Sequence, residues 1–231
     1  YYALPLLARA AGLSSGTLSL LRNSFLVLAS YVFYGWWDPS RVLLLLQMTL
    51  AHYSCGHYVA RTEATDRQRR WGLTLAAIVS LGTLGFFKYF TFLQQNENPL
   101  LSWVGADTGQ VWRIELPMGI SFYTFQALSY SIDVARGTAP RARSLIDFAA
   151  YISLFPQLIA GPIVRYNTVA QQLVRRRHSW EQCAAGVSLF ILGFSKKVLL
   201  ADPLGESADA AFGAESLGVG DAWFGALAFT L

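Results

Sequence analysis

The sequence predicts an all-α fold, a polytopic integral membrane bundle of helices with one re-entrant segment. Of the 231 residues, 54% are hydrophobic and only 14% are charged, whereas about 25% of the residues in an ordinary soluble domain carry a charge. The apolar residues gather in long runs separated by arginine clusters, as in a chain that crosses a bilayer several times. We therefore expect residues 1–231 to form a single membrane domain.

The net charge, the two cysteines and the ends of the sequence give further information about the class of protein. The formal net charge of +4 does not indicate nucleic-acid binding, because the arginines lie at the ends of apolar runs and form no basic patch. Cys55 and Cys183 are too far apart in sequence to indicate a disulfide framework. The chain starts at Tyr1 without a methionine and stops at Leu231 inside an apolar run. We expect an N-terminal part of a longer protein, truncated at both ends.

Apolar runs mark the expected spans. Residues 24–37 and 41–59 predict a helical hairpin, because Asp38-Pro39 between them suits a turn and proline cannot continue a helix. Residues 71–93 are the clearest span, since 23 residues are enough to cross a hydrocarbon core of about 30 Å. The other expected spans or parts of spans are residues 1–7, 183–201 and 222–231.

Basic residues predict the orientation, because cytoplasmic loops near the ends of spans retain lysine and arginine. If the spans alternate in direction, 13 of the 18 basic residues fall on one side and only Arg41 and Arg113 on the other. The first side is therefore expected to be cytoplasmic. Residues 202–221 carry five acidic residues and no basic one, as an external loop would.

Residues 145–164 differ from the other apolar runs because they contain helix breakers. The stretch LFPQLIAGPIVRY, residues 154–166, holds two prolines, a glycine and a glutamine before its arginine. Arg141 precedes the run and Arg165 follows it, so we expect the segment to enter the membrane and return to the same side. Broken backbone is tolerated at membrane depth where protein or a watery cavity covers it. The breakers thus indicate a cavity, and a proline-kinked helix that only packs is the alternative.

The preceding residues, 116–137, predict a helix with one polar face. Four polar residues follow the spacing i, i+3, i+7, i+10: Tyr123, Gln126, Tyr130 and Asp133. At about 100° per residue they stay within an arc of about 80°. A carboxylate in a membrane helix is expected to face protein or water. The alternative is an interfacial acid beside Arg136, with tyrosines that only join helices.

Four strings carry a resemblance to a known family: FFKYF, LPMGISFYTFQALSYSIDVARG, LFPQLIAGPIVRY and GFSKKVLLAD. In this order and at these separations they resemble the membrane-bound O-acyltransferase family, in the branch of the alginate O-acetyltransferases and the D-alanyl transferases of teichoic acid. The resemblance is strongest over residues 84–202. It implies a multi-pass enzyme of the bacterial inner membrane that passes an acyl group, acetyl as the first choice, from a cytoplasmic donor for O-acetylation of an exported polysaccharide such as alginate.

The resemblance also implies the substrates, partners and site. The donor would be acetyl-CoA or another acyl thioester, with no bound cofactor. The partners would be the lipid bilayer, a periplasmic or extracellular acetyltransferase and the polysaccharide. The family's catalytic histidine lies on a later helix, so no catalytic residue is expected before residue 231. The candidates for lining the substrate tunnel or shaping the re-entrant segment are Tyr123, Gln126, Asp133, Gln157, Gly161, Pro162 and Arg165. Each could instead only hold the segment together.

Other sites and function classes have weaker support. His52 and His57 point about 140° apart on a helix, so together with Cys55 they make a poor metal site, and we expect no metal. D-alanyl transfer to teichoic acid is the alternative within the family. A secondary transporter would show paired helix interruptions in two halves, and one broken run is present. A structural membrane subunit would not need the polar face.

Overall fold

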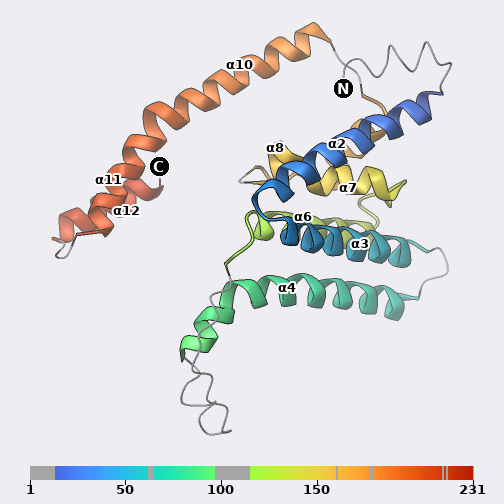
Figure 1. Ribbon diagram of the computed structural model, residues 1–231, viewed down its shortest axis with the longest axis horizontal. Helices are drawn as coiled ribbons and strands as arrows, with labels where there is room; N and C mark the ends of the chain where they lie inside the picture. Colours follow the sequence, from blue (N-terminus) through green and yellow to red (C-terminus); the bar gives the residue numbers. More distant parts are fainter. Residues whose placement is uncertain are drawn as a thin grey trace, which may run out of the picture. The chain divides into compact units, whose positions relative to one another are not determined.

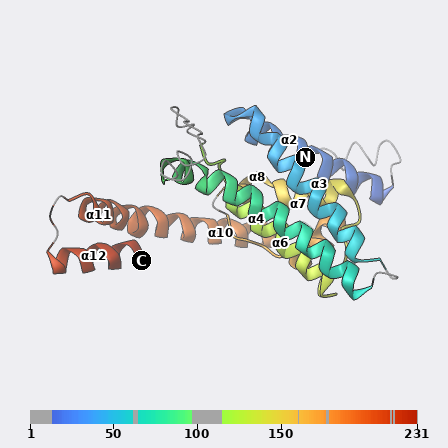
Figure 2. The same ribbon diagram turned by 90° about the horizontal axis from the view of Figure 1, so that it is seen from below.

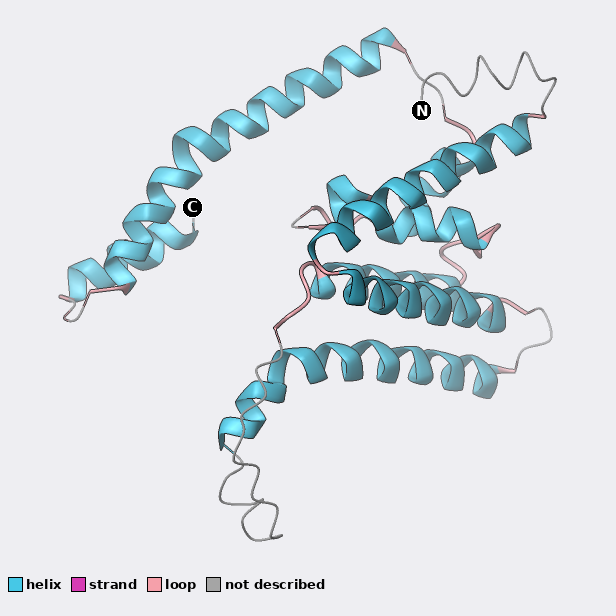
Figure 3. Cartoon of the chain, in the orientation of Figure 1, coloured by secondary structure: helices cyan, strands magenta, loops and turns pink. Residues whose placement is uncertain are grey.

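The computed structural model is helical in all of its regular structure (Figure 3). The residues that it describes are 14–61, 65–96, 115–159, 161–176, 179–214, 216 and 218–230. Within them, three helical stretches are long and apolar enough to cross a membrane: Gly16–Trp36, Asp66–Phe90 and Trp180–Phe212. The predicted all-α membrane fold is confirmed, while the expected span at residues 1–7 lies outside the described residues.

The chain divides into two compact units, unit 1 (Tyr1–Arg176) and unit 2 (Arg177–Leu231). Whether the two act as one membrane domain stays a prediction. The helices of unit 1 are α2 (Ser15–Trp37), α3 (Val42–Val59), α4 (Asp66–Asn96), α6 (Ile120–Ala135), α7 (Leu145–Ser153), α8 (Phe155–Leu158) and α9 (Tyr166–Val174). In unit 1, α2 packs on α7, and α3, α4 and α6 pack on one another (Figures 1 and 2).

Hydroxyl side chains fix where several helices begin. Ser14, Ser144 and Ser179 each accept a hydrogen bond from the backbone N–H three residues later. Thr65 and Gln68 exchange two such bonds at the start of α4, which is a capping box. Each cap satisfies an N–H that the helix itself leaves free and contributes about 1 kcal/mol.

The turn between α2 and α3 confirms the predicted helical hairpin. Pro39 begins a single 3-10 turn, Pro39–Arg41, and the Asp38 carboxylate accepts bonds from the N–H and the hydroxyl of Ser40 at 2.9 and 2.6 Å. The Ser40 hydroxyl, together with Arg41, holds the pKa of Asp38 below its ordinary value. Arg41 bonds Asp38 at 2.7 Å and donates to the carbonyl of Glu115 at 2.6 Å, which ties the turn to the chain that leads into α6.

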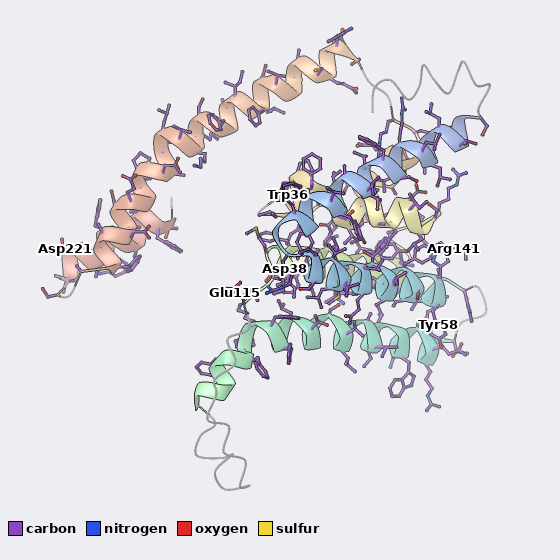
Figure 4. The ribbon with its side chains drawn as sticks, in the orientation of Figure 1. Trp36, Asp38, Tyr58, Glu115, Arg141 and Asp221 are labelled. Atoms are coloured by element: carbon purple, nitrogen blue, oxygen red, sulfur yellow. The ribbon has the colours of Figure 1, made fainter. Side chains whose placement is uncertain are left out.

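Arginines follow the end of α3 (Arg61), begin α4 (Arg67, Arg69 and Arg70) and follow the end of α6 (Arg136), and we call this end of the described helices the arginine end. Here Gly56 of α3 lies against Tyr130 of α6, and Gly72 of α4 lies against Val59 of α3. The end of α3, the end of α6 and the start of α4 are therefore adjacent. Figure 4 shows Tyr58 and Arg141 at this end and Trp36, Asp38 and Glu115 at the opposite one. The alternation of the helices on which the predicted orientation rests is thus present in unit 1.

Unit 2 contains α10 (Trp180–Lys196), a π-helical turn (Lys197–Ala201), α11 (Asp202–Phe212) and α12 (Val219–Thr230), and α11 packs on α12. Pro203 has no N–H to donate to the preceding turn, and the wide turn just before it accommodates this loss. The expectation of a loop over residues 202–221 is wrong for residues 202–212. That stretch contains three alanines, which are strong helix formers.

Candidate functional site

A single asparagine joins the beginning and the end of residues 145–176, which we call the returning hairpin. Asn23 on α2 is fully buried, and its Nδ2 donates to Asp147 Oδ1 at 2.6 Å and to the carbonyl of Leu173 at 2.9 Å. Its Oδ1 accepts a bond from Arg176 Nη2 at 2.7 Å. We call Asn23 with these three bonds the clasp. Asp147 lies in the first turn of α7 and Leu173 in the last turn of α9. The chain therefore returns to the place where it entered.

The tip of the returning hairpin lies further along α2. The N–H of Phe155 donates to Ser30 Oγ at 3.1 Å, and Ser30 is about 10 Å along the helix from Asn23. Ile159 reaches a cavity that is also lined by Tyr34 and Trp36, near the end of α2. The predicted turn back is thus seen in the chain. The side of the membrane on which its two ends lie stays a prediction.

Of the two prolines in the predicted broken run, the first one, Pro156, marks the first helix break, before Gly161 and Pro162. The first break is at Leu154, where φ and ψ are −53° and 110°. Pro156, in the first turn of α8, has no N–H for the carbonyl of Ile152, so α7 cannot continue through it. Pro162 is exposed in the irregular stretch 161–165.

Gly161 has a packing role that no other residue type can fill. A Cβ added to it would lie 2.5 Å from both the Cα and the carbonyl oxygen of Gln157. Real Cβ atoms do not approach backbone so closely, because the van der Waals repulsion is too large. The chain can fold back against α8 because residue 161 is glycine.

Two of the predicted tunnel residues meet in the structure. Gln126 of α6 is buried, and its Nε2 donates to the carbonyl of Tyr151 on α7 at 2.9 Å. Its Oε1 accepts a bond from Gln157 Nε2 of α8 at 3.1 Å. The hydroxyl of Tyr151 in turn donates to the carbonyl of Val164 at 2.7 Å. These bonds tie both limbs of the returning hairpin to each other and to α6.

The predicted polar face of α6 is directed into the protein. Tyr123, Gln126, Tyr130 and Asp133 are all less than one tenth exposed. Tyr123 lies edge-on to Tyr34, with ring centroids 6.3 Å apart, and the hydroxyl of Tyr130 accepts a bond from the N–H of Ala142 at 3.0 Å. Among the described residues, the Asp133 carboxylate has no ion-pair partner, Arg136 included. The face is therefore buried as predicted, without the interfacial ion pair.

Arg165 is not brought together with these residues. It lies exposed directly before α9 and forms no ion pair within the part of the chain that the structure describes. Its neighbour Tyr166 packs against Tyr130 and Tyr151, with ring centroids 5.0 and 5.2 Å apart. The guanidinium is thus free to meet a solvent-borne group near the arginine end.

A cavity of about 290 Å³ lies beside the returning hairpin. Leu26 and other apolar side chains line most of it, and its polar lining comes from Tyr151, Gln157, Gln172 and Arg176. Amide groups and one guanidinium on apolar walls can hold a slender chain that carries amides and an anionic end. This lining contains no histidine, cysteine or carboxylate, so its chemistry is that of binding and orientation.

Sequence reasoning did not predict the roles of two buried polar residues, His52 and Asn23. His52 is fully buried, and its Nδ1 and Nε2 lie 2.8 and 2.7 Å from the hydroxyls of Ser131 and Ser80. It therefore joins α3, α6 and α4, and no group of three possible metal ligands occurs among the described residues. Asn23 could have been noticed as an amide inside an otherwise apolar run, because polar groups within membrane helices face partners.

The residues of this site fall within a region that is similar to a known protein family. The sequence pattern of MBOAT, the membrane-bound O-acyltransferase family, matches residues 73–215, a range that includes α6, the whole returning hairpin and α10. The chain belongs to the membrane-bound O-acyltransferase family. The resemblance found in the sequence is confirmed, and the chain is part of a multi-pass membrane protein.

Three relatives indicate which members of the family are similar. A protein of Pseudomonas aeruginosa named "Probable alginate O-acetylase AlgI" is 42% identical over 209 residues, which cover 90% of this chain and 40% of that protein. A protein of the same name from Azotobacter vinelandii is 43% identical, with 90% of this chain and 42% of that protein covered. A "Peptidoglycan O-acetyltransferase" of Helicobacter pylori is 30% identical, with 91% and 44% covered.

The chain thus spans about two fifths of the length of the curated relatives that it matches. No solved structure matches it. The roles assigned to individual tunnel residues stay predictions.

Proposed function

We propose that the full-length protein is an O-acyltransferase of the bacterial inner membrane that passes an acetyl group from a cytoplasmic thioester to an exported polysaccharide such as alginate. The observation that carries the proposal is the similarity to alginate O-acetylases over 90% of this chain. Acetyl-CoA is the first candidate donor. A periplasmic or extracellular acetyltransferase is the expected partner for the step outside the membrane.

The named relatives favour acetyl over D-alanyl transfer. The three relatives named above are called O-acetylases or O-acetyltransferases, whether the polymer in the name is alginate or peptidoglycan. Peptidoglycan is therefore the second candidate acceptor. A secondary transporter loses its support because the chain matches an acyltransferase family over residues 73–215.

The described residues support a binding and positioning role for this part of the enzyme. Gln126 and Gln157 hold the returning hairpin against α6, and Gly161 permits the close return of its chain. Tyr123 and Asp133 extend the same buried face of α6. We assign to this set, with Pro162, the shaping of one wall of the donor path, and to the exposed Arg165 the attraction of a donor phosphate. The catalytic histidine is expected beyond residue 231.

Purified full-length protein, inserted in vesicles, tests the proposal directly. Transfer of a labelled acetyl group from acetyl-CoA to an acceptor is expected, with less transfer from a D-alanyl thioester. Arg165→Lys keeps the charge but loses the planar fork that binds phosphate in a bidentate manner, so the donor KM should rise while insertion is unchanged. Arg143→Lys, also exposed, is the matched control. An unchanged KM in Arg165→Lys would contradict donor binding, and absence of transfer from any acyl thioester would contradict the function.

A further inference from the structure

A groove with a volume of about 470 Å³ runs between α3 and α4 near the arginine end. Its floor is narrow because Cys55 Sγ approaches the carbonyl of Gly72, donating to it at 3.4 Å. Ser54 lines the α3 side, and Leu75 and Val79 line the α4 side. Leu75 is 63% exposed, so the groove is open on its α4 side. Its lining spans about 10 Å of α3 and about 12 Å of α4, and its walls are suited to a hydrocarbon chain.

Aromatic side chains and arginines stand at one end of this groove. Tyr58 and Trp71 line it there and are 36% and 62% exposed, and Tyr58 is at the arginine end in Figure 4. Half-exposed tyrosine and tryptophan are typical of the level of lipid headgroups. The Arg61 guanidinium lies 5.6 Å from the centre of the Tyr58 ring.

The charge at this end selects for an anion. Residues 61–70 contain four arginines and two acidic residues, which leaves a net positive charge. The helix that follows is a candidate span, Asp66–Phe90, so these arginines lie where a membrane helix meets water. Basic pockets between membrane helices bind the headgroups of acidic lipids. An apolar groove of this kind, continuous with a positive end, fits one amphiphile with an anionic head.

We propose that the groove between α3 and α4 binds an anionic phospholipid, such as phosphatidylglycerol. One acyl chain lies between Ser54 and Leu75, and the phosphate meets Arg61, beside Tyr58. This site is separate from the returning hairpin and does not depend on the acyl-transfer proposal. It gives the protein a lipid requirement that is independent of its donor and acceptor.

Photo-crosslinking of the full-length protein tests the site. The protein is placed in bilayers of equal amounts of phosphatidylglycerol and phosphatidylcholine, with a photoactivatable group on the acyl chain of one lipid or the other. We expect phosphatidylglycerol adducts on Leu75 and Val79 to exceed phosphatidylcholine adducts by about fivefold for each arginine that meets the phosphate. Phe190, exposed on α10, reports ordinary lipid contact and should show no preference.

Two variants separate charge from shape. Arg61→Gln should lower the preference for phosphatidylglycerol about fivefold, whereas Arg143→Gln, an exposed arginine before α7, should leave it unchanged. Ser54→Phe fills the groove and should remove adducts of both lipids at Leu75 but not at Phe190. If Ser54→Phe fails to fold, the Arg61→Gln comparison still tests the site.

Equal labelling by the two lipids at Leu75 overturns the proposal. Absence of adducts there, because another part of the chain or a second copy covers the groove, overturns it as well.

Discussion

Units 1 and 2 are both helical and apolar, yet they differ in what they bury. Unit 1 buries Asn23, His52 and Gln126 with hydrogen-bond partners on other helices. In unit 2 the described helix α10 has no buried residue, and α11 and α12 bury only alanine and glycine. Lipid tails are as apolar as leucine, so hydrophobicity inserts helices but does not choose their neighbours. Polar and small side chains make that choice. Between α11 and α12 the described buried residues are only small ones, whereas unit 1 also buries polar groups that bond across helices.

The largest expected difference between the units is that the returning hairpin of unit 1 does not cross the membrane, whereas the long helical stretch of unit 2 does. Cysteines at positions 143 and 168, on either side of the tip of the returning hairpin, should both react with a membrane-impermeant thiol reagent from the cytoplasmic side only. Cysteines at positions 179 and 214 flank the candidate span Trp180–Phe212 and should react from opposite sides. The measurement is labelling of full-length protein in intact cells and in inverted vesicles. Labelling of positions 143 and 168 from different sides would show that the hairpin crosses the membrane.

Replacement of the clasp residue should give the largest loss of stability. Asn23→Leu removes the donor to Asp147 and leaves a buried carboxylate without that partner, so the free energy of unfolding should fall by about 3 kcal/mol. Thermal unfolding of the purified full-length protein measures the change. Thr17→Leu on the same helix is the matched control, because it removes only an exposed bond to the Ser14 hydroxyl, and it should cost about 0.5 kcal/mol or less. Equal melting temperatures for Asn23→Leu and wild type would remove Asn23 from its assigned role.

Two glycines sharpen the comparison between the units. Gly161→Ala places a Cβ 2.5 Å from backbone atoms of Gln157, so the chain must shift, at a cost of about 1–3 kcal/mol. Gly193 of α10 has no atom within 4 Å of the same position, and Gly193→Ala should stabilise the helix by up to about 1 kcal/mol. The two melting temperatures should move in opposite directions. A neutral Gly161→Ala would mean that the return of the chain is less tightly packed than described.

The histidine that joins three helices should contribute less than the clasp. His52→Leu removes the bonds to Ser80 and Ser131, and hydrogen bonds between membrane helices average about 0.6 kcal/mol each, so we expect a loss of about 1 kcal/mol. A double-mutant cycle of His52→Leu with Ser131→Ala isolates the shared part of this loss. Ser188→Leu in α10 is the control, because within the described part of the chain its hydroxyl bonds only Ala184 of its own helix. A coupling energy of zero between His52 and Ser131 would contradict the three-helix role.

The smallest effect is expected at the α2–α3 turn. The pKa of Asp38 is below its ordinary value because Ser40 and Arg41 favour the carboxylate. A lowered folded-state pKa stabilises the fold above the unfolded pKa, about 3.9, and this contribution is lost as pH falls through the folded pKa. The melting temperature of wild type should exceed that of Asp38→Asn slightly at pH 7, and the two should converge below about pH 4. A difference that persists at the lowest pH would assign the effect to the hydrogen bonds of the turn alone.

Local patterns predicted the parts of this structure that depend on local chemistry. Asp38-Pro39 indicated a turn because proline ends a helix wherever it occurs, and the spacing of Tyr123 and Asp133 indicated a common face. The clasp could not be predicted in this way, since the partners of Asn23 lie 124 and 150 residues away in the sequence. The position of the first helix break was not predicted either, because both Pro156 and Pro162 were candidates for it. The direction of the chain after α8 depends on the close contact between Gly161 and Gln157, which the sequence alone does not show.

The clasp also has a consequence for the order of events during synthesis. Asn23 leaves the ribosome 150 residues before Leu173, which at about 5–20 residues per second is an interval of about 8–30 s. Throughout that time the amide lacks the acceptors that it has in the finished protein, although its helix is long and apolar enough to enter the bilayer at once. Closure of the returning hairpin is therefore a late event, and a pause in translation between α7 and α9 would prolong a half-clasped membrane intermediate.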